Sequence, residues 1–239
     1  MQTVDPPQSP IRSWKAFGVQ YFMIVVSILT ALGFEQVVTN VRRTSGAEDA
    51  QREIEEELRK NLKDVRESYQ SNAGRLTDLE AWDGEAIREF GSATPNPANQ
   101  QRLIASAQGL WKRNSIWTPT LQHAAWDVAI ANQSAGHIPT PTLRKYATAY
   151  TAQHDSEEFT RLNFLTTLDE GHLINVMADA DLGKATGQDV LRATRQLILV
   201  LKQTQNHLRH LEQELVPALP GESATLRNPA PPASTAAAR

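Results

Sequence analysis

The segment Ala16–Phe34, AFGVQYFMIVVSILTALGF, constrains the fold of this chain more than any other feature. No charged residue interrupts it, and its clearly polar residues are Gln20, Ser27 and Thr30. About 18 residues at ~1.5 Å rise each form a helix of roughly 27 Å, close to the ~30 Å hydrocarbon thickness of a bilayer. Its Val, Ile, Leu and Phe side chains favour insertion by roughly 0.3–0.6 kcal/mol each, which outweighs the polar groups. The sequence therefore predicts one transmembrane helix.

Two other interpretations of this segment stay open. A buried helix of a soluble core is one, although core helices rarely run this long without a polar face. A cleaved secretory signal is the other. Its apolar region is typically ~7–15 residues long and is followed by a small-x-small cleavage site. Here the apolar run is longer, and Gly33 to Val37 offers no such site.

Basic residues flank the segment almost equally on its two sides. Arg12 and Lys15 precede it, and Arg42, Arg43 and Arg52 follow it. The N-terminal amine adds one positive charge to the first side. Because positively charged flanks stay in the cytoplasm, we expect a short cytoplasmic tail and a periplasmic C-terminal domain in a bacterial inner membrane.

Composition excludes several classes of site and partner. The 239 residues include no cysteine, which rules out disulfides, thiolate zinc sites, iron–sulfur clusters and cysteine nucleophiles. The net charge of −3 offers no basic face for phosphates, so we expect no nucleic-acid partner. The expected partners are the lipid bilayer and either another protein or further copies of this chain.

Beyond the apolar segment, the sequence predicts an all-α fold: one transmembrane helix followed by an elongated antiparallel helical bundle. The predicted domains are a disordered N-terminal tail at 1–11, the transmembrane helix at 12–43, the bundle at 44–216 and a disordered Pro/Ala-rich tail at 217–239. Apolar residues recur at helical spacing from Ser45 to about Phe90, at Ile54, Leu58, Leu62, Val65, Tyr69, Leu76 and Leu79.

Start and stop signals predict further helices. We expect helices at 98–112, from Thr118-Pro119 to Ser134 with Gly136 as a left-handed terminus, and from Thr140 to Asp169. Leu143, Tyr146, Tyr150, Leu162 and Leu165 of that last helix are predicted to face inward. A short helix at 171–182 should end at Gly183. Thr186-x-x-Asp189 should cap a final helix at 187–215, whose apolar face carries Val190, Leu191, Leu197, Ile198, Leu201, Leu208, Leu211 and Leu215.

Candidate chemistry is sparse. The chain has no G-x-S-x-G, H-E-x-x-H, P-loop or G-x-G-x-x-G motif. His207, His210 and Glu214 are spaced to share one helix face, as bundle metal ligands do, but such a site needs ligands from other helices. The segment from Asp179 to Gly183 fails the ligand pattern of a calcium loop. We expect the pairs Glu55–Glu57 and Glu157–Glu158 to lie on solvated helix faces. We therefore predict no catalytic, cofactor-binding or metal residues and no enzymatic activity.

Two stretches resemble a group of uncharacterised bacterial single-pass membrane proteins. The first is Leu29-Thr-Ala-Leu-Gly-Phe-Glu-Gln-Val-Val38 with Arg42-Arg43, the charged helix from Ala50 to Leu58, and Asn61 a turn later. The second runs from Ala125-Trp126 to Pro139 and is similar to the group's W-x-x-A-x-x-x-G-x-x-x-x-x-P region, with Asn132 or Gln133 where a glycine is common. The resemblance covers roughly residues 15–70 and 117–155. It implies a membrane-anchored helical domain of unknown function and supplies no catalytic residues.

These observations favour a membrane-tethered module for protein interaction, scaffolding or sensing without catalysis, by analogy with other helical bundles on membrane anchors. The alternatives are a membrane-bound enzyme or metal-site bundle, and a secreted helical protein with a cleaved signal.

Overall fold

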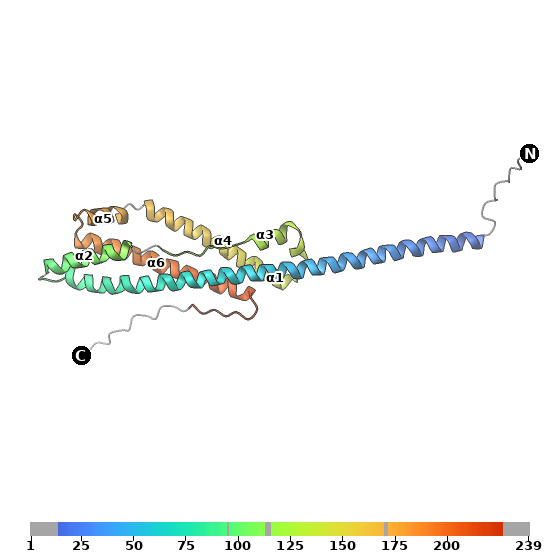
Figure 1. Ribbon diagram of the computed structural model, residues 1–239, viewed down its shortest axis with the longest axis horizontal. Coiled ribbons are helices and arrows are strands. Elements are labelled where there is room, and N and C mark those ends of the chain that lie inside the picture. The colour runs from blue at the N-terminus through green and yellow to red at the C-terminus, as the bar shows by residue number, and fades with distance from the viewer. Residues whose placement is uncertain (1–13, 95, 113–115, 170–171, 227–239) are drawn as a thin grey trace, which may run out of the picture. The chain divides into compact units, whose positions relative to one another are not determined.

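A computed structural model describes residues 14–94, 96–112, 116–169 and 172–226. Over these residues the chain forms six α-helices, two short 3-10 helices and no strand, which confirms the predicted all-α fold (Figure 1). All of the predicted N-terminal tail (1–11) and residues 227–239 of the predicted C-terminal tail (217–239) lie outside the described residues.

The first helix, α1 (Trp14–Phe90), carries the apolar segment. The chain divides into two units, residues 1–49 and 50–239, and α1 contributes to both. Thr44–Gly46 are helical and lie within α1. In the first unit, Phe17–Gln36 has a mean hydropathy of 1.9 and is long and apolar enough to cross a membrane. A secretory signal sequence meets the same criterion.

No residue of the segment Phe17–Gln36 is buried. It is therefore not a core helix of this chain, which removes one of the two alternative interpretations. Its polar groups are satisfied locally: Ser27 Oγ donates to the Met23 carbonyl (2.8 Å) and Thr30 Oγ1 donates to the Val26 carbonyl (2.7 Å). Such bonds back to the preceding turn let hydroxyl groups exist in an apolar surrounding without a water partner.

In the second unit, α6 (Gly187–Leu215) runs antiparallel to α1. Three ion pairs fix this register: Arg66–Glu212, Lys202–Glu80 and Arg195–Asp83. The predicted apolar stripe of α1 is buried at six of its seven positions, with Tyr69 only half-buried. On the apolar face of α6, every predicted residue but Leu191 is buried. These two faces supply most of the core.

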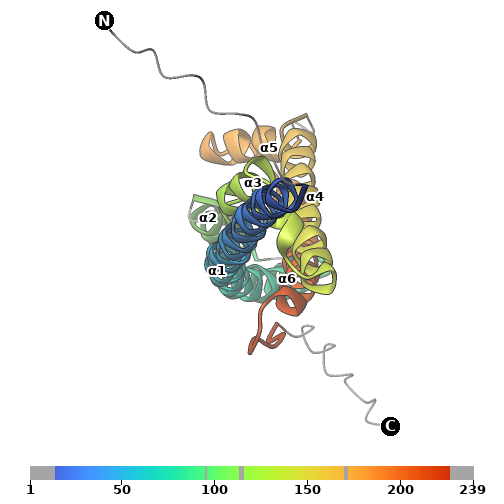
Figure 2. The same ribbon diagram turned by 90° about the vertical axis from the view of Figure 1, so that its right-hand side faces the viewer.

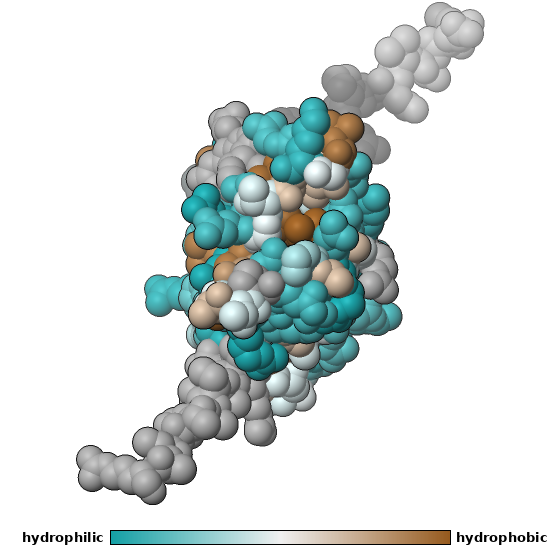
Figure 3. Space-filling view, turned by 90° about the vertical axis from the view of Figure 1, so that its left-hand side faces the viewer, coloured by the Kyte–Doolittle hydropathy of each residue, from teal (hydrophilic) through white to brown (hydrophobic). Residues whose placement is uncertain are grey.

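Two shorter helices close one end of the bundle. α2 (Pro97–Lys112) and α5 (His172–Asp181) pack with α6 around a shared apolar cluster. Trp82 Nε1 donates to the Leu103 carbonyl (3.0 Å), and Trp111 Nε1 donates to Thr194 Oγ1 (3.2 Å), so both buried indoles have a polar partner. This end of the bundle faces the viewer in Figure 3 and is mainly hydrophilic, with small apolar patches.

α4 (Thr140–Asp169) packs beside α6 (Figure 2) and is hydrogen-bonded to α1. Its Tyr146, Tyr150 and Gln153 contact Glu55, Glu57 and Asn61 in the same order along the chain, so α4 runs parallel to α1. Of the inward-facing residues predicted for α4, Tyr146 and Tyr150 are buried and Leu143 is half-buried, whereas Leu162 is 50% exposed and that prediction is wrong. The side chain of Leu165 is outside the described set.

The predicted cap of α6 is confirmed. Thr186 Oγ1 accepts from the Asp189 backbone N–H (3.2 Å), and the Asp189 carboxylate accepts from the Thr186 N–H (3.3 Å). Gly183 has a φ of +69°, the left-handed conformation expected after α5. Asp181, from the rejected calcium pattern, pairs with Lys112 of α2 (3.2 Å).

The helix predicted from Thr118 to Ser134 is wrong at both ends. α3 covers only Ala124–Ala131, and a 3-10 helix, η1 (Ser134–His137), follows it. The left-handed residue is Gln133 (φ 65°) rather than Gly136. Hydrogen bonds from Asn72 to the Trp117 backbone and from Asn61 to the Gln122 backbone hold this stretch outside a helix and override the local start signal.

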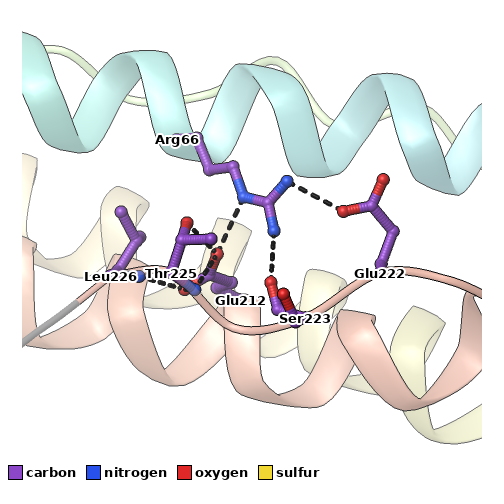
Figure 4. Close-up of polar contacts among 6 residues, drawn as sticks. All are labelled: Arg66, Glu212, Glu222, Ser223, Thr225 and Leu226. Atoms are coloured by element: carbon purple, nitrogen blue, oxygen red, sulfur yellow. Dashed lines mark hydrogen bonds and ion pairs between the residues drawn. The ribbon is translucent and has the colours of Figure 1, made fainter.

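The chain after α6 folds back onto the bundle. A 3-10 helix, η2 (Val216–Ala218), precedes buried Leu219, so residues 217–226 do not form the predicted disordered tail. Figure 4 shows why: buried Glu212 accepts from Arg66 Nε (2.8 Å), Thr225 and the Leu226 N–H (2.8 Å). Burial alone would raise the pKa of Glu212, but these hydrogen bonds outweigh burial and lower it.

Candidate functional site

A surface groove of about 460 Å³ lies between the start of α3 and the middle of α4. Its lining residues combine aromatic, acidic, imidazole and amide side chains: His123, Trp126, Asp127, Ala147, Tyr150, Thr151, Gln153, His154 and Glu157. We refer to it as the α3–α4 groove.

The segment 116–123 leads into one wall of this groove and has no regular secondary structure. Two buried asparagines of α1 hold its backbone. Asn72 accepts from the Trp117 N–H (2.9 Å) and donates to the Trp117 carbonyl (2.7 Å). Asn61 likewise accepts from the Gln122 N–H (2.9 Å) and donates to the Gln122 carbonyl (2.7 Å).

The spacing of the two asparagines explains the shape of this segment. Eleven residues at ~1.5 Å rise separate Asn61 from Asn72 by about 16.5 Å, roughly three turns along one helix face. Trp117 and Gln122 are five residues apart and cover about 16.5 Å only if the chain is nearly fully extended, at ~3.3 Å per residue. Segment 116–123 is therefore an extended strap antiparallel to α1, and it delivers His123 to the groove.

Asn61 also orients the base of the groove. Because its oxygen accepts from the Gln122 N–H, its amide nitrogen faces away and donates to Gln153 Oε1 (2.9 Å) as well as to Gln122. Gln153 must then present its oxygen to α1 and its nitrogen to the other side. Within the described residues Gln153 Nε2 is buried and has no hydrogen-bond partner, while the residue is only 3% exposed and lines the groove.

Glu57 supports both walls of the groove from behind. Its carboxylate accepts from the Ala125 N–H at the start of α3 (3.0 Å) and from the Tyr150 hydroxyl of α4 (2.6 Å). His123 makes no side-chain cap, so Glu57 acts as the cap of α3. Burial, followed by the hydrogen bond to Glu57, raises the pKa of Tyr150, which keeps this hydroxyl a neutral donor. Tyr150 also stacks on Trp126, with ring centroids 5.1 Å apart.

The mouth of the groove is charged. His123 Nδ1 lies 2.7 Å from Asp127 Oδ2, and both side chains are exposed. The hydrogen bond to Asp127 is the main reason that the pKa of His123 is raised, and the charges of Asp127, Glu157 and Glu57 add to it. The carboxylates of Asp127 and Glu157 both line the groove.

A second groove shares Ala147 and Thr151 of α4 with the first and contains the residues that the sequence singled out. His207, His210 and Glu214 of α6 face Asp155 of α4 in a space of about 380 Å³. His207 stacks on Phe159 with ring centroids 4.1 Å apart. Burial lowers the pKa of His207, and the nearby His210 lowers it further. We refer to it as the α4–α6 groove.

The α4–α6 groove does not assemble a metal centre from the described residues. No group of three or more His, Asp and Glu side chains among them is placed to hold a metal ion. Asp155 joins the three α6 residues only as a lining residue of the same groove.

Sequence reasoning missed most of the α3–α4 groove. The interpretation of Glu55–Glu57 as a solvated face is wrong, because the two carboxylates accept from buried Tyr146 (3.0 Å) and Tyr150 (2.6 Å). His123 and His154, which lie far apart in the sequence, line one groove. One signal was available: Asn61 and Asn72 fall in phase with the apolar stripe of α1, where a polar side chain is buried and therefore needs specific partners.

Comparisons of this chain with protein-family models, with curated proteins and with solved structures find no match.

Proposed function

We propose that this protein is a membrane-tethered binding module without catalysis, and that the α3–α4 groove is its binding site. The single observation that carries the proposal is the amide of Gln153. Asn61 fixes its orientation, and among the described residues its buried nitrogen has no hydrogen-bond partner. A buried donor without a partner costs about 1–3 kcal/mol, and a ligand oxygen that accepts from it would remove this cost.

The other lining residues support recognition of a ligand. A stacked Trp126–Tyr150 pair offers apolar surface, and the exposed Asp127 offers charge. A few polar groups set into an apolar, concave surface are typical of ligand sites, and the groove volume falls within their usual range. The sequence contains none of the nucleophile or phosphate-binding motifs considered above, which favours binding over catalysis.

Cross-linking in intact cells tests the binding site. A photo-reactive residue at His154, which lines only the α3–α4 groove, should yield an adduct. The matched control is the same residue at His210, which lines only the α4–α6 groove and should yield none. The adduct from position 154 should disappear in a Gln153→Leu background. Equal adducts from both positions, or none from position 154, would contradict the proposal.

The membrane anchor is part of the proposal. The unburied apolar segment Phe17–Gln36 supports it. If it spans the bilayer, alkaline extraction leaves the full chain in the membrane fraction, and the N-terminus of the mature chain begins near Met1. A mature chain that begins after Phe34 would instead identify a cleaved signal and a secreted protein.

We further propose a bacterial inner-membrane location with the C-terminal domain in the periplasm. The support is the extra positive charge of the N-terminal amine beside Arg12 and Lys15. A C-terminal alkaline phosphatase fusion should be active and a C-terminal fluorescent protein that folds only in the cytoplasm should be dark. The reverse pattern would place the domain in the cytoplasm.

A further inference from the structure

We infer that the ligand of the α3–α4 groove is a peptide segment with a positively charged side chain, whose backbone carbonyl accepts from Gln153 Nε2 and whose cation lies among Trp126, Asp127 and Glu157. This inference rests on the proposed function and adds the chemistry of the partner. Three independent features of the groove lead to it.

The first feature is the polarity of the unpaired group. Gln153 Oε1 is already used by Asn61, so the amide can offer only its N–H donors to a ligand. The complementary atom is an acceptor oxygen. A carboxylate oxygen is disfavoured, because Asp127 and Glu157 line the same groove and would repel a second negative charge. A neutral carbonyl, as in a peptide bond, satisfies the donor without this repulsion.

The second feature is the charge of the groove. Asp127 and Glu157 belong to different helices, α3 and α4, and both line it, with Glu57 behind them. The basic side chains within the lining are the imidazoles of His123 and His154, and His123 is already hydrogen-bonded to Asp127. The balance favours a cation on the ligand.

The third feature is the aromatic pair. Trp126 stacks on Tyr150 through one face and is itself only half-buried. A guanidinium or ammonium group that lies over an indole and next to a carboxylate gains both a cation–π and a charged hydrogen bond. An acceptor, a cation and a short aliphatic spacer between them are what an arginine or lysine residue within a peptide provides.

A free amine with no carbonyl, such as a polyamine, shares the cation but not the acceptor. A free amino acid has the acceptor only as a carboxylate. The peptide, the polyamine and the free amino acid therefore differ in which groove residues they use, and a Gln153 variant distinguishes them.

Binding to the full-length protein in detergent micelles tests the inference by calorimetry. The probes are acetyl-Ala-Arg-Ala-amide, its citrulline counterpart, which keeps the shape without the charge, and agmatine, which keeps the guanidinium without a backbone carbonyl. We expect the arginine peptide to bind about tenfold or more tightly than either, since the citrulline peptide lacks the cation and agmatine lacks the backbone carbonyl.

Variants assign the contacts. Asp127→Asn and Glu157→Gln should each weaken the arginine peptide about tenfold and leave the citrulline peptide unchanged. Gln153→Leu should weaken both peptides and leave agmatine unchanged. The matched control is Glu158→Gln, one residue from Glu157 but paired with Arg161 and absent from the groove lining, which should change nothing. Circular dichroism of each variant confirms that it is folded.

Equal binding of the arginine and citrulline peptides, tighter binding of agmatine, or no binding of the arginine peptide would overturn the inference. If an uncharged or acidic peptide binds instead and Gln153→Leu abolishes that binding, the proposed binding function stands and only the assigned ligand class fails. If the cross-linking from His154 also fails, the proposed function fails with it.

Discussion

Two buried polar clusters lie along α1, and they differ in whether their hydrogen bonds are complete. Around Glu212, the carboxylate accepts from Arg66, Thr225 and Leu226 and holds the C-terminal segment (Figure 4). Around Asn61, the amide makes three hydrogen bonds, but the neighbouring Gln153 has a buried nitrogen with no partner among the described residues. The comparison indicates that the complete cluster stabilises the fold, whereas the incomplete one supplies the proposed binding site.

Breaking the complete cluster should give the largest loss of stability. Arg66→Ala leaves the buried Glu212 carboxylate without its main cation and should lower the free energy of unfolding by about 3–5 kcal/mol. Chemical denaturation followed by circular dichroism measures it. Glu222→Ala removes the more exposed partner of Arg66 and should cost at most about 1 kcal/mol. Equal losses for the two variants would show that Glu212 does not depend on Arg66.

Breaking the incomplete cluster should cost less stability but should affect the groove. Asn61→Ala leaves the Gln122 backbone and Gln153 Oε1 unpaired, for a loss of about 2–3 kcal/mol by denaturation. It should also weaken the arginine peptide, because the Gln153 amide loses its fixed orientation. Asn72→Ala is the matched control: it frees Trp117, costs about 1–2 kcal/mol and should leave peptide binding intact. Equal effects of the two variants on binding would argue against the orienting role of Asn61.

His207 of the α4–α6 groove should have a smaller, pH-dependent effect on stability. Burial lowers the folded-state pKa of His207 below its ordinary value of 6.5, so protonation favours the unfolded chain. Stability should therefore be complete above pH 6.5 and decline as the pH falls from there through the folded-state pKa. His207→Gln should flatten this decline in denaturation curves, and His137→Gln in the exposed η1 should not. A decline that survives in His207→Gln would assign it to other groups.

His123 of the α3–α4 groove should change stability with pH in the opposite direction, and its effect should be the smallest. The pKa of His123 is raised by its hydrogen bond to Asp127, so the folded state favours the protonated form. Its contribution to stability is present below pH 6.5 and is lost as the pH rises through the raised pKa. NMR titration of the imidazole should show a midpoint above 6.5 that falls in Asp127→Asn. An unchanged midpoint would exclude the pair in solution.

The parts of the fold that depend on local signals could be predicted from the sequence. The period of Ile54, Leu58 and Leu62 predicted a buried helix face, and Thr186 with Asp189 predicted the start of α6, because both patterns act within a few turns. The conformation of the strap could not be predicted in this way, because it is set by Asn61 and Asn72, which lie some fifty residues earlier in the chain. The α3–α4 groove could not be predicted for the same reason, since its lining comes from α3 and α4 and its support comes from α1.

The two asparagines have a consequence for how this region can change over time. Within the strap, they bind the backbone of Trp117 and Gln122 and no side chain, so most side chains in between are free to vary. They also fix the number of residues in that interval, because one residue more or less would displace the strap by about 3.3 Å and break one of the two clamps. Among related sequences, this stretch should therefore tolerate substitution but not insertion or deletion, the reverse of what is usual for a surface connection.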